Sequence, residues 1–207
     1  MRANEYQLEA SRTERINWAN SHGPDIARLG IIGEAGSFAS VIKKHQRDDA
    51  AYANYSEHFI EEAGDVLWYV VTIASRLGIK LDDWPAPAVY QDAFVGFYSL
   101  YEKIFEISTL AVALKSPSTI DANKMRPLIR GVLADLGALV GFHNLGLGEV
   151  ARYSCDKNLS YWCKFEECPA RIFDSKFPWY EQLPREFEIE FHSIGNDSLI
   201  MVMDKIQ

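Results

Sequence analysis

The sequence has little cysteine, no long apolar run and no cluster of basic residues. Three cysteines in 207 residues, Cys155, Cys163 and Cys168, fit a reducing compartment. No apolar run approaches the roughly 20 residues that a membrane-spanning helix requires. The opening residues MRANEYQLEASRTER lack the apolar stretch of a signal peptide. We therefore expect a cytoplasmic protein without a membrane partner.

The charge balance argues against a nucleic-acid partner. Lys and Arg number 21 against 29 Asp and Glu, which gives a formal charge of -8 at pH 7. Without a basic run the chain has no surface suited to a nucleic-acid backbone, whereas a small phosphate ligand that arrives with its own metal is compatible with this charge. Hydrophobic residues make up 48% of the chain and aromatic residues 13%, which is enough for a packed core.

Two short acidic patterns stand out in the first half of the chain. The first is Glu34-Ala-Gly-Ser37, and the second is Glu61-Glu62-Ala-Gly-Asp65. Both lie in runs with helical spacing of apolar residues, and residues three apart on a helix share a face. Glu34 and Ser37 therefore point the same way, as do Glu62 and Asp65, and both patterns project oxygen atoms.

Apolar side chains at helical spacing flank both patterns and mark faces that pack. They are Ile31, Ala35, Phe38 and Ile42 around the first pattern, and Phe59, Val66, Tyr69, Val70 and Ile73 around the second. Burying an unpaired carboxylate costs several kcal/mol, so a bundle with Glu34, Glu62 and Asp65 near its core must pair them or neutralise them with a cation. Carboxylate and hydroxyl oxygens suit Mg²⁺ or Mn²⁺ rather than zinc.

These residues carry a family resemblance. The stretches GEAGSFASVIKK and EEAGDVLWYVVTIASRLGI resemble the MazG-like, all-α nucleotide pyrophosphohydrolase superfamily, whose signature is Glu-x-x-Glu followed a loop later by Glu-x-x-Asp. Residues 4–13 are also similar to the family's opening helix, and the resemblance covers residues 4–84. It implies a Mg²⁺-dependent enzyme that cleaves a nucleoside triphosphate between its α and β phosphates, giving the monophosphate and pyrophosphate.

The resemblance places Glu34, Glu62 and Asp65 on metal-ligand positions. Ser37 stands where the family has its second Glu, so we expect weaker metal affinity, with the hydroxyl still able to hold a metal-bound water. Glu61 lies on a different face of the helix from Glu62 and is a candidate to take the proton of the attacking water. The alternative is a catalytically impaired relative that binds nucleotide or serves as an assembly module, and Ser37 is the feature that separates the two.

Five residues are candidates for phosphate contacts: Lys43, Lys44, Arg152, Lys157 and Asn158. The two lysines stand near the end of a predicted helix, where positive charge is favourable even without a ligand. The other three lie in a segment, 145–162, that resembles the tail of the family's fourth helix, and surface solvation is their alternative role. Four aromatic residues can either stack on a base or pack in the core: Trp18, Trp68, Tyr69 and Trp84.

Helical periodicity predicts an all-α bundle that ends near Trp162. The expected helices cover residues 4–20, 24–45, 54–78, 90–115, 123–145 and 148–162. Asn54 and Glu57 have the spacing of a capping box at the start of the third helix. The tail, 166–207, is rich in proline and aromatic residues, and its alternating stretches 187–191 and 199–203 flank a turn. This alternation predicts a short C-terminal β-hairpin.

Part of the chain repeats itself. Residues 106–115 align without gaps on 34–43, and Leu145-Gly146-Leu147 echoes Leu77-Gly78-Ile79. This predicts a helical domain over 1–165 built as a tandem pseudo-dimer, with unit one at 1–84 and a degenerate unit two at 90–162. Unit two has Arg130 and Leu133 where unit one has Glu62 and Asp65, so it cannot hold a metal in the same way.

A plain antiparallel bundle without duplication is the alternative to the pseudo-dimer. A lone hairpin is marginally stable, so the one predicted in 166–207 must lie on the bundle, pair with another chain in a homo-oligomer, or begin a further domain.

Overall fold

The computed structural model describes residues 1–14, 16, 18, 22–110, 119–161, 187–194 and 198–205. The chain divides into two compact units, Met1–Asp156 and Lys157–Gln207. The first unit is built from α-helices and one short 3-10 turn, which confirms the predicted all-α class for that part of the chain. None of the helices in the described ranges is both long and apolar enough to cross a membrane.

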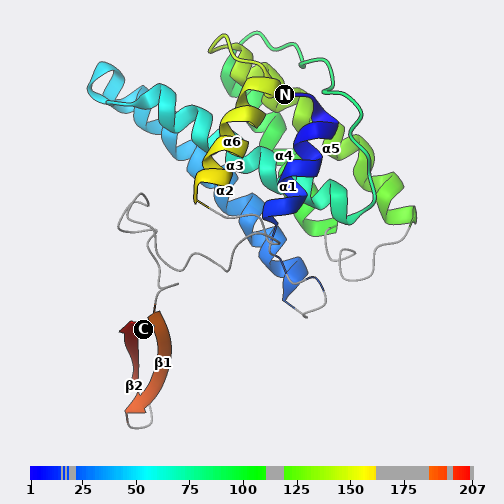
Figure 1. Ribbon diagram of the computed structural model, residues 1–207. Helices are drawn as coiled ribbons and strands as arrows, with labels where there is room; N and C mark the ends of the chain where they lie inside the picture. Colours follow the sequence, from blue (N-terminus) through cyan, green and yellow to red (C-terminus); the bar gives the residue numbers. More distant parts are fainter. Residues whose placement is uncertain are drawn as a thin grey trace. The chain divides into compact units, whose positions relative to one another are not determined.

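The helices follow one another along the chain, and a long connector joins α3 to α4 (Figure 1). They are α1 (Ala3–Thr13), α2 (Gly23–Asp48), η1 (Asp49–Ala51), α3 (Tyr55–Arg76), α4 (Ala93–Leu110), α5 (Thr119–Gly141) and α6 (Leu147–Tyr161). In the second unit, β1 (Phe187–Ile194) and β2 (Ser198–Lys205) pair antiparallel, with Phe187 opposite Lys205 and Ile194 opposite Ser198.

Four helices form the centre of the first unit. α2 packs on α3 and α4 packs on α5, while α2 also contacts α4 and α3 contacts α5 (Figure 1). α3 has one largely enclosed face, and its buried apolar residues are Phe59, Ala63, Val66, Leu67, Val70, Val71, Ile73 and Ala74. Fully burying a large apolar side chain contributes about 1.5–3 kcal/mol, so this helix holds the unit together.

α2 and α3 approach closely because Gly30 has no side chain. A Cβ atom on Gly30 would overlap the ring of Tyr69, which therefore lies directly against the α2 backbone. Glu34 lies one turn after Gly30, and Asp65 lies one turn before Tyr69. The two helices run antiparallel, so this contact brings the two acidic patterns to the same level of the bundle.

A second close contact joins α3 to α6 and α1. A Cβ on Gly64 would lie 3.0 Å from the Ser154 Cβ, and the Ser154 hydroxyl lies 3.3 Å from the Gly64 carbonyl oxygen. The buried Tyr6 hydroxyl lies 2.8 Å from the same Ser154 hydroxyl. Burial raises the pKa of Tyr6, so it stays protonated and this contact stays neutral. Helices α1 and α6 are thereby fixed beside Asp65.

α1 is shorter than predicted. The helix expected over 4–20 ends at Thr13, and Glu14 has extended backbone angles, φ -70° and ψ 128°. The Glu14 carboxylate accepts hydrogen bonds from the backbone N–H of Ile16 and from the indole N–H of Trp18, the latter at 2.9 Å. A side chain that binds nearby N–H groups competes with helix continuation, which is why the prediction was wrong.

The predicted capping box at the start of α3 is also wrong. Asn54 has the left-handed φ of 61°, and its side chain makes no capping hydrogen bond. The chain reverses between η1 and α3 within a few residues, and asparagine tolerates the left-handed conformation better than most residues. Asp92 is a cap that the sequence reading missed. Its side chain accepts hydrogen bonds from the backbone N–H groups of Phe94 and Val95, so α4 begins at Ala93 rather than at Tyr90.

α3 and α5 end in the same way, α3 at Gly78 as predicted and α5 two residues before the Gly146 that the repeat indicated. Gly78 has φ 67°, and the following Ile79 N–H donates to the Ala74 carbonyl. Asn144 has φ 57°, and the following Leu145 N–H donates to Val140 in the same pattern. The residue that corresponds to Gly78 is therefore Asn144, and the predicted pairing of Gly78 with Gly146 is wrong.

Candidate metal and nucleotide site

Three carboxylates from two helices meet in the first unit. Each of Glu34 on α2 and Glu62 and Asp65 on α3 offers an oxygen atom, and these oxygens all lie within 4.8 Å of one another. All three residues are half-buried. The predicted convergence of the two acidic patterns is therefore present in the structure.

Helix geometry and one glycine explain this convergence. Glu62 and Asp65 are three residues apart, so α3 presents them on one face. Gly30 lets α2 approach that face, and Glu34 then lies opposite Asp65. No loop is needed to position these side chains, because all three stand on helices.

The cluster makes its surroundings electronegative. Burial raises the pKa of Tyr69, and the nearby charges of Glu34 and Asp65 raise it further. Burial likewise raises the pKa of Tyr52, with the charge of Glu62 adding to the effect. Two carboxylate charges within 4.8 Å of each other repel by on the order of 3 kcal/mol or more at the effective dielectric of a protein surface. A hard divalent cation relieves that repulsion, and an all-oxygen donor set fits Mg²⁺ or Mn²⁺.

Ser37 and Glu61 lie next to the cluster in sequence. Ser37 is half-buried on α2, one turn beyond Glu34, on the same side of the helix. Glu61 is half-buried on α3 and is turned about 100° around the helix axis from Glu62. Ser37 therefore shares a helix face with a member of the cluster, and Glu61 borders that face.

The five phosphate candidates lie in different places. Lys43 is exposed and stands nine residues beyond Glu34, so it is roughly 13 Å along α2 and on the opposite face. Lys44 is exposed, with its ammonium 6.0 Å from the Tyr52 ring centre. Arg152 is exposed on α6, two residues before the Ser154 that contacts α3. Lys157 and Asn158 are half-buried and belong to the second compact unit.

Comparison with known proteins agrees with this geometry. Residues 23–86, which contain all three carboxylates, match the MazG nucleotide pyrophosphohydrolase domain. The chain is also 34% identical to the Gene 37 protein of Mycobacterium phage L5 over 82 residues, which is 37% of this chain and 72% of that protein. The chain belongs to the MazG family. No solved structure gives a significant match.

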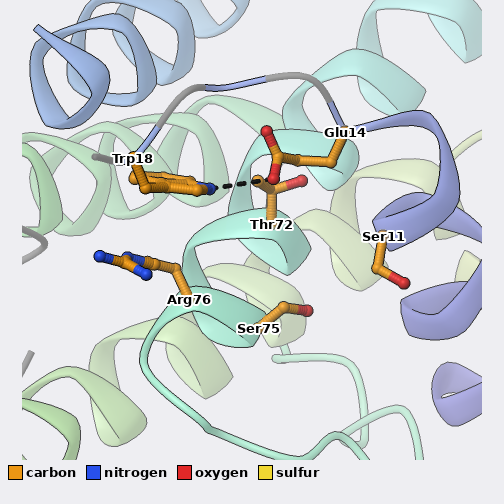
Figure 2. A pocket seen from close by; sticks show the side chains of 6 residues that line it. All are labelled: Ser11, Glu14, Trp18, Thr72, Ser75 and Arg76. Carbon is orange, nitrogen blue, oxygen red and sulfur yellow. Dashed lines mark hydrogen bonds between the residues drawn. The ribbon is translucent and has the colours of Figure 1, made fainter. Parts of the chain in front are cut away.

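A pocket that the sequence did not predict lies partly outside the matched MazG residues 23–86. It has a volume of about 190 Å³ and lies between α3 and the segment that follows α1 (Figure 2). Its lining residues are Ser11, Glu14, Trp18, Thr72, Ser75 and Arg76. Thr72 lies seven residues after Asp65, close to two full helical turns, so both are on the same face of α3. The seven-residue spacing of Asp65 and Thr72 was the feature of the sequence that could have indicated a polar residue near the cluster.

Proposed function

We propose that the protein is a Mg²⁺-dependent nucleoside triphosphate pyrophosphohydrolase that cleaves between the α and β phosphates. The products are the nucleoside monophosphate and pyrophosphate. The observation that carries this proposal is the meeting of Glu34, Glu62 and Asp65 from two antiparallel helices of a MazG domain. Mn²⁺ is the alternative ion, because it accepts the same oxygen ligands.

Each residue of the candidate site has its own proposed role. Glu34, Glu62 and Asp65 hold the cation, which when bound supplies charge neutralisation for the phosphates and activation of the attacking water. Ser37 offers a hydroxyl on the same face as Glu34. Glu61 borders the cluster and is the general base that takes the proton from the water as it attacks the phosphorus.

The leaving pyrophosphate needs positive charge as well as the cation. Arg152 on α6 is proposed as a phosphate contact because its guanidinium suits phosphate oxygens, although two residues separate it from Ser154 and put it on the other side of α6 from the contact with Gly64. Lys157 and Asn158 follow on the same helix and are proposed as further contacts. Lys43 and Lys44 are weaker proposals, because Lys43 lies on the face of α2 opposite Glu34.

Ser37 favours a second candidate function. With a serine at this position the site has one formal charge fewer than the family signature, which lowers the affinity for a divalent cation. A protein of this kind could bind a nucleotide, or serve as an assembly module, without turning the nucleotide over. The two candidate functions use the same fold, and they differ in whether the protein releases pyrophosphate from a nucleotide.

Pyrophosphate release separates the two candidates. Purified full-length protein is incubated with each ribo- and deoxyribonucleoside triphosphate, with Mg²⁺ and separately with Mn²⁺, and pyrophosphate and monophosphate are quantified. The enzyme proposal expects equal amounts of both products with at least one nucleotide, lost in Glu62→Gln. Release of inorganic phosphate instead, or no release with any nucleotide or ion, contradicts it.

We also propose that α4 and α5 form the second unit of a tandem pseudo-dimer. Support comes from the packing of the α2–α3 pair on the α4–α5 pair and from the matching ends of α3 and α5. If the units are independent repeats, a chain cut in the connector 82–91 should reassociate when its two parts are co-expressed. Parts that remain separate would favour a plain bundle. The domain boundary near 165, with a β-hairpin tail after it, stays a prediction.

A further inference from the structure

The pocket between α3 and the segment after α1 contains a polar group that the fold leaves unsatisfied. Thr72 is only 3% exposed, and its hydroxyl has no hydrogen-bond partner in the described part of the chain. Leaving a buried hydroxyl unpaired destabilises the folded protein, so such a group calls for an explanation. Figure 2 shows Thr72 between Trp18 and Ser11, facing the space that these residues enclose.

The walls of the pocket are rich in hydrogen-bond acceptors. Ser11 donates its proton to the Leu8 carbonyl at 2.6 Å, and Ser75 donates its proton to the Val71 carbonyl at 2.9 Å. Both hydroxyls therefore present lone pairs rather than protons, and one lone pair of Ser75 already accepts a hydrogen bond from the Gln7 amide at 3.1 Å. The Glu14 carboxylate adds two oxygens, each of which keeps a lone pair after accepting from Ile16 and Trp18. A ligand that fits these walls must bring donors.

One wall is a flat aromatic ring held in place. The Trp18 indole N–H donates to Glu14 at 2.9 Å, and the guanidinium of Arg76 lies 5.3 Å from the Trp18 ring centre (Figure 2). A fixed indole suits a flat heterocyclic ring. The volume of about 190 Å³ is smaller than the roughly 300 Å³ at which pockets for drug-sized ligands begin. The pocket therefore holds a base and not a whole nucleotide.

The pocket is at the right distance from the carboxylate cluster. The helical rise puts Thr72 roughly 10 Å from Asp65 along α3, on the same face, which matches the span between the base and the phosphates of one nucleotide. Trp68 and Tyr69 lie between the two positions on α3, so a nucleotide with its phosphates at the carboxylates would pass these rings to place its base in the pocket.

We propose that this pocket binds the base of the substrate and selects bases with an exocyclic amino group, cytosine before uracil. The amino group donates to the Glu14 carboxylate and the serine oxygens. The Thr72 hydroxyl pairs with the base edge, and Arg76 faces the ring carbonyl that cytosine and uracil share. Uracil has a second carbonyl where cytosine has its amino group. That carbonyl oxygen would then face the Glu14 and serine oxygens, and neither side supplies a proton for a hydrogen bond. This inference rests on the proposed function, because it assumes that the phosphates bind at the carboxylates.

Cytosine and uracil nucleotides are a matched pair for the test, since they have the same ring and differ only in the group at C4 and in the proton on the adjacent N3. Hydrolysis of dCTP and dUTP is measured with Mg²⁺, and the binding of dCMP and dUMP is measured by calorimetry. We expect wild type to have a KM about tenfold lower for dCTP than for dUTP. Thr72→Val should raise KM for dCTP about tenfold with little change in kcat, because one buried hydrogen bond to the base is lost. Thr72→Ser keeps the hydroxyl and should keep the affinity.

Stability separates a binding role for Thr72 from a structural one. Thr72→Val replaces an unpaired buried hydroxyl with a methyl group, so its Tm should be no lower than that of wild type. Thr109→Val is the matched control, because Thr109 is exposed on α4, and it should change neither KM nor the preference. Glu14→Gln brings an amide donor to the pocket and should reduce the preference for cytosine.

The outcomes distinguish this inference from the proposed function. Hydrolysis of dCTP and dUTP with equal KM, unchanged in Thr72→Val, would overturn the pocket and leave the enzyme intact. If no nucleotide is hydrolysed, tighter binding of dCMP than dUMP that is lost in Thr72→Val would support the pocket alone. Equal or absent binding of the two monophosphates in that case would overturn the pocket as well.

Discussion

The ring of Tyr69 on α3 occupies the place where Gly30 on α2 would carry a side chain. This contact lies one turn from Glu34 on α2 and one turn from Asp65 on α3, and it sets the distance between the two helices there. The carboxylate cluster therefore depends on a residue that carries no functional group. A glycine inside a long helix lowers helix stability, and here the contact with Tyr69 explains its presence.

Gly30→Ala should destabilise the protein. The new methyl group overlaps a half-buried tyrosine ring, and overpacking of this kind costs about 1–3 kcal/mol, more than the helix propensity gained. Gly33→Ala on the same helix is the control, because a Cβ there meets nothing within 4 Å. It should stabilise by about 0.5–1 kcal/mol. Urea denaturation of both variants checks the pair, and equal effects of the same sign would contradict the packing argument.

Asp65→Asn should remove the stabilisation that a divalent cation provides. A cation that binds the folded cluster raises Tm with concentration, since the unfolded chain has no such cluster. The amide keeps the shape of the side chain but loses its charge and half of its oxygen ligands. Thermal melts with and without Mg²⁺ measure the shift. Glu57→Gln, an exposed substitution in the first turn of the same helix, should keep the wild-type response, and a similar loss there would point to a non-specific charge effect.

Ser37→Glu should strengthen metal binding and raise pyrophosphate release. It restores the Glu-x-x-Glu spacing on a face that already carries Glu34, and Gly33 and Gly36 leave open space nearby. The larger side chain next to buried Phe38 could cost roughly 1–3 kcal/mol, so stability is measured together with activity.

Ser37→Gln has the same size without the charge and controls for the charge of the new carboxylate. A stable Ser37→Glu protein that binds metal more tightly, yet like its parent releases no pyrophosphate, would leave the binding or assembly module as the function.

Stability should fall as the pH drops below about 6.5, and His143 should account for part of the change. Burial against aromatic rings lowers the pKa of His143, and the nearby His45 lowers it further. The unfolded chain then binds a proton at a higher pH than the folded one does. Stability is therefore complete above the unfolded pKa and is lost as the pH falls through the folded pKa.

Tyr55, whose hydroxyl lies 3.1 Å from His143 Nε2, does not titrate in this range because burial raises its pKa to about 12. The check is the difference in Tm between pH 7.5 and 5.5 for wild type and His143→Gln. The imidazole is only partly buried, so we expect a small difference, with wild type losing more. An equal loss in both proteins would assign the acid sensitivity to other groups.

Much of the carboxylate cluster follows from local sequence. Glu62 and Asp65 share a face on any α-helix, and Glu34 stands on another helix with a packing face of its own. The helical class follows in the same way, from apolar spacing that continues through most of the first unit. Element ends were harder to predict, because single side chains such as Glu14 and Asp92 decide them by binding nearby N–H groups.

The sequence by itself determined which residues carry oxygen ligands and which faces of their helices they occupy, because the helical repeat is a property of the backbone. Only the tertiary structure decided that α2 and α3 approach closely at Gly30, that α1 stops at Thr13, and that a pocket forms beside Thr72. These features depend on residues far apart in the chain that meet through packing. The spacing of residues along one helix does not predict which side chain of another helix packs against them.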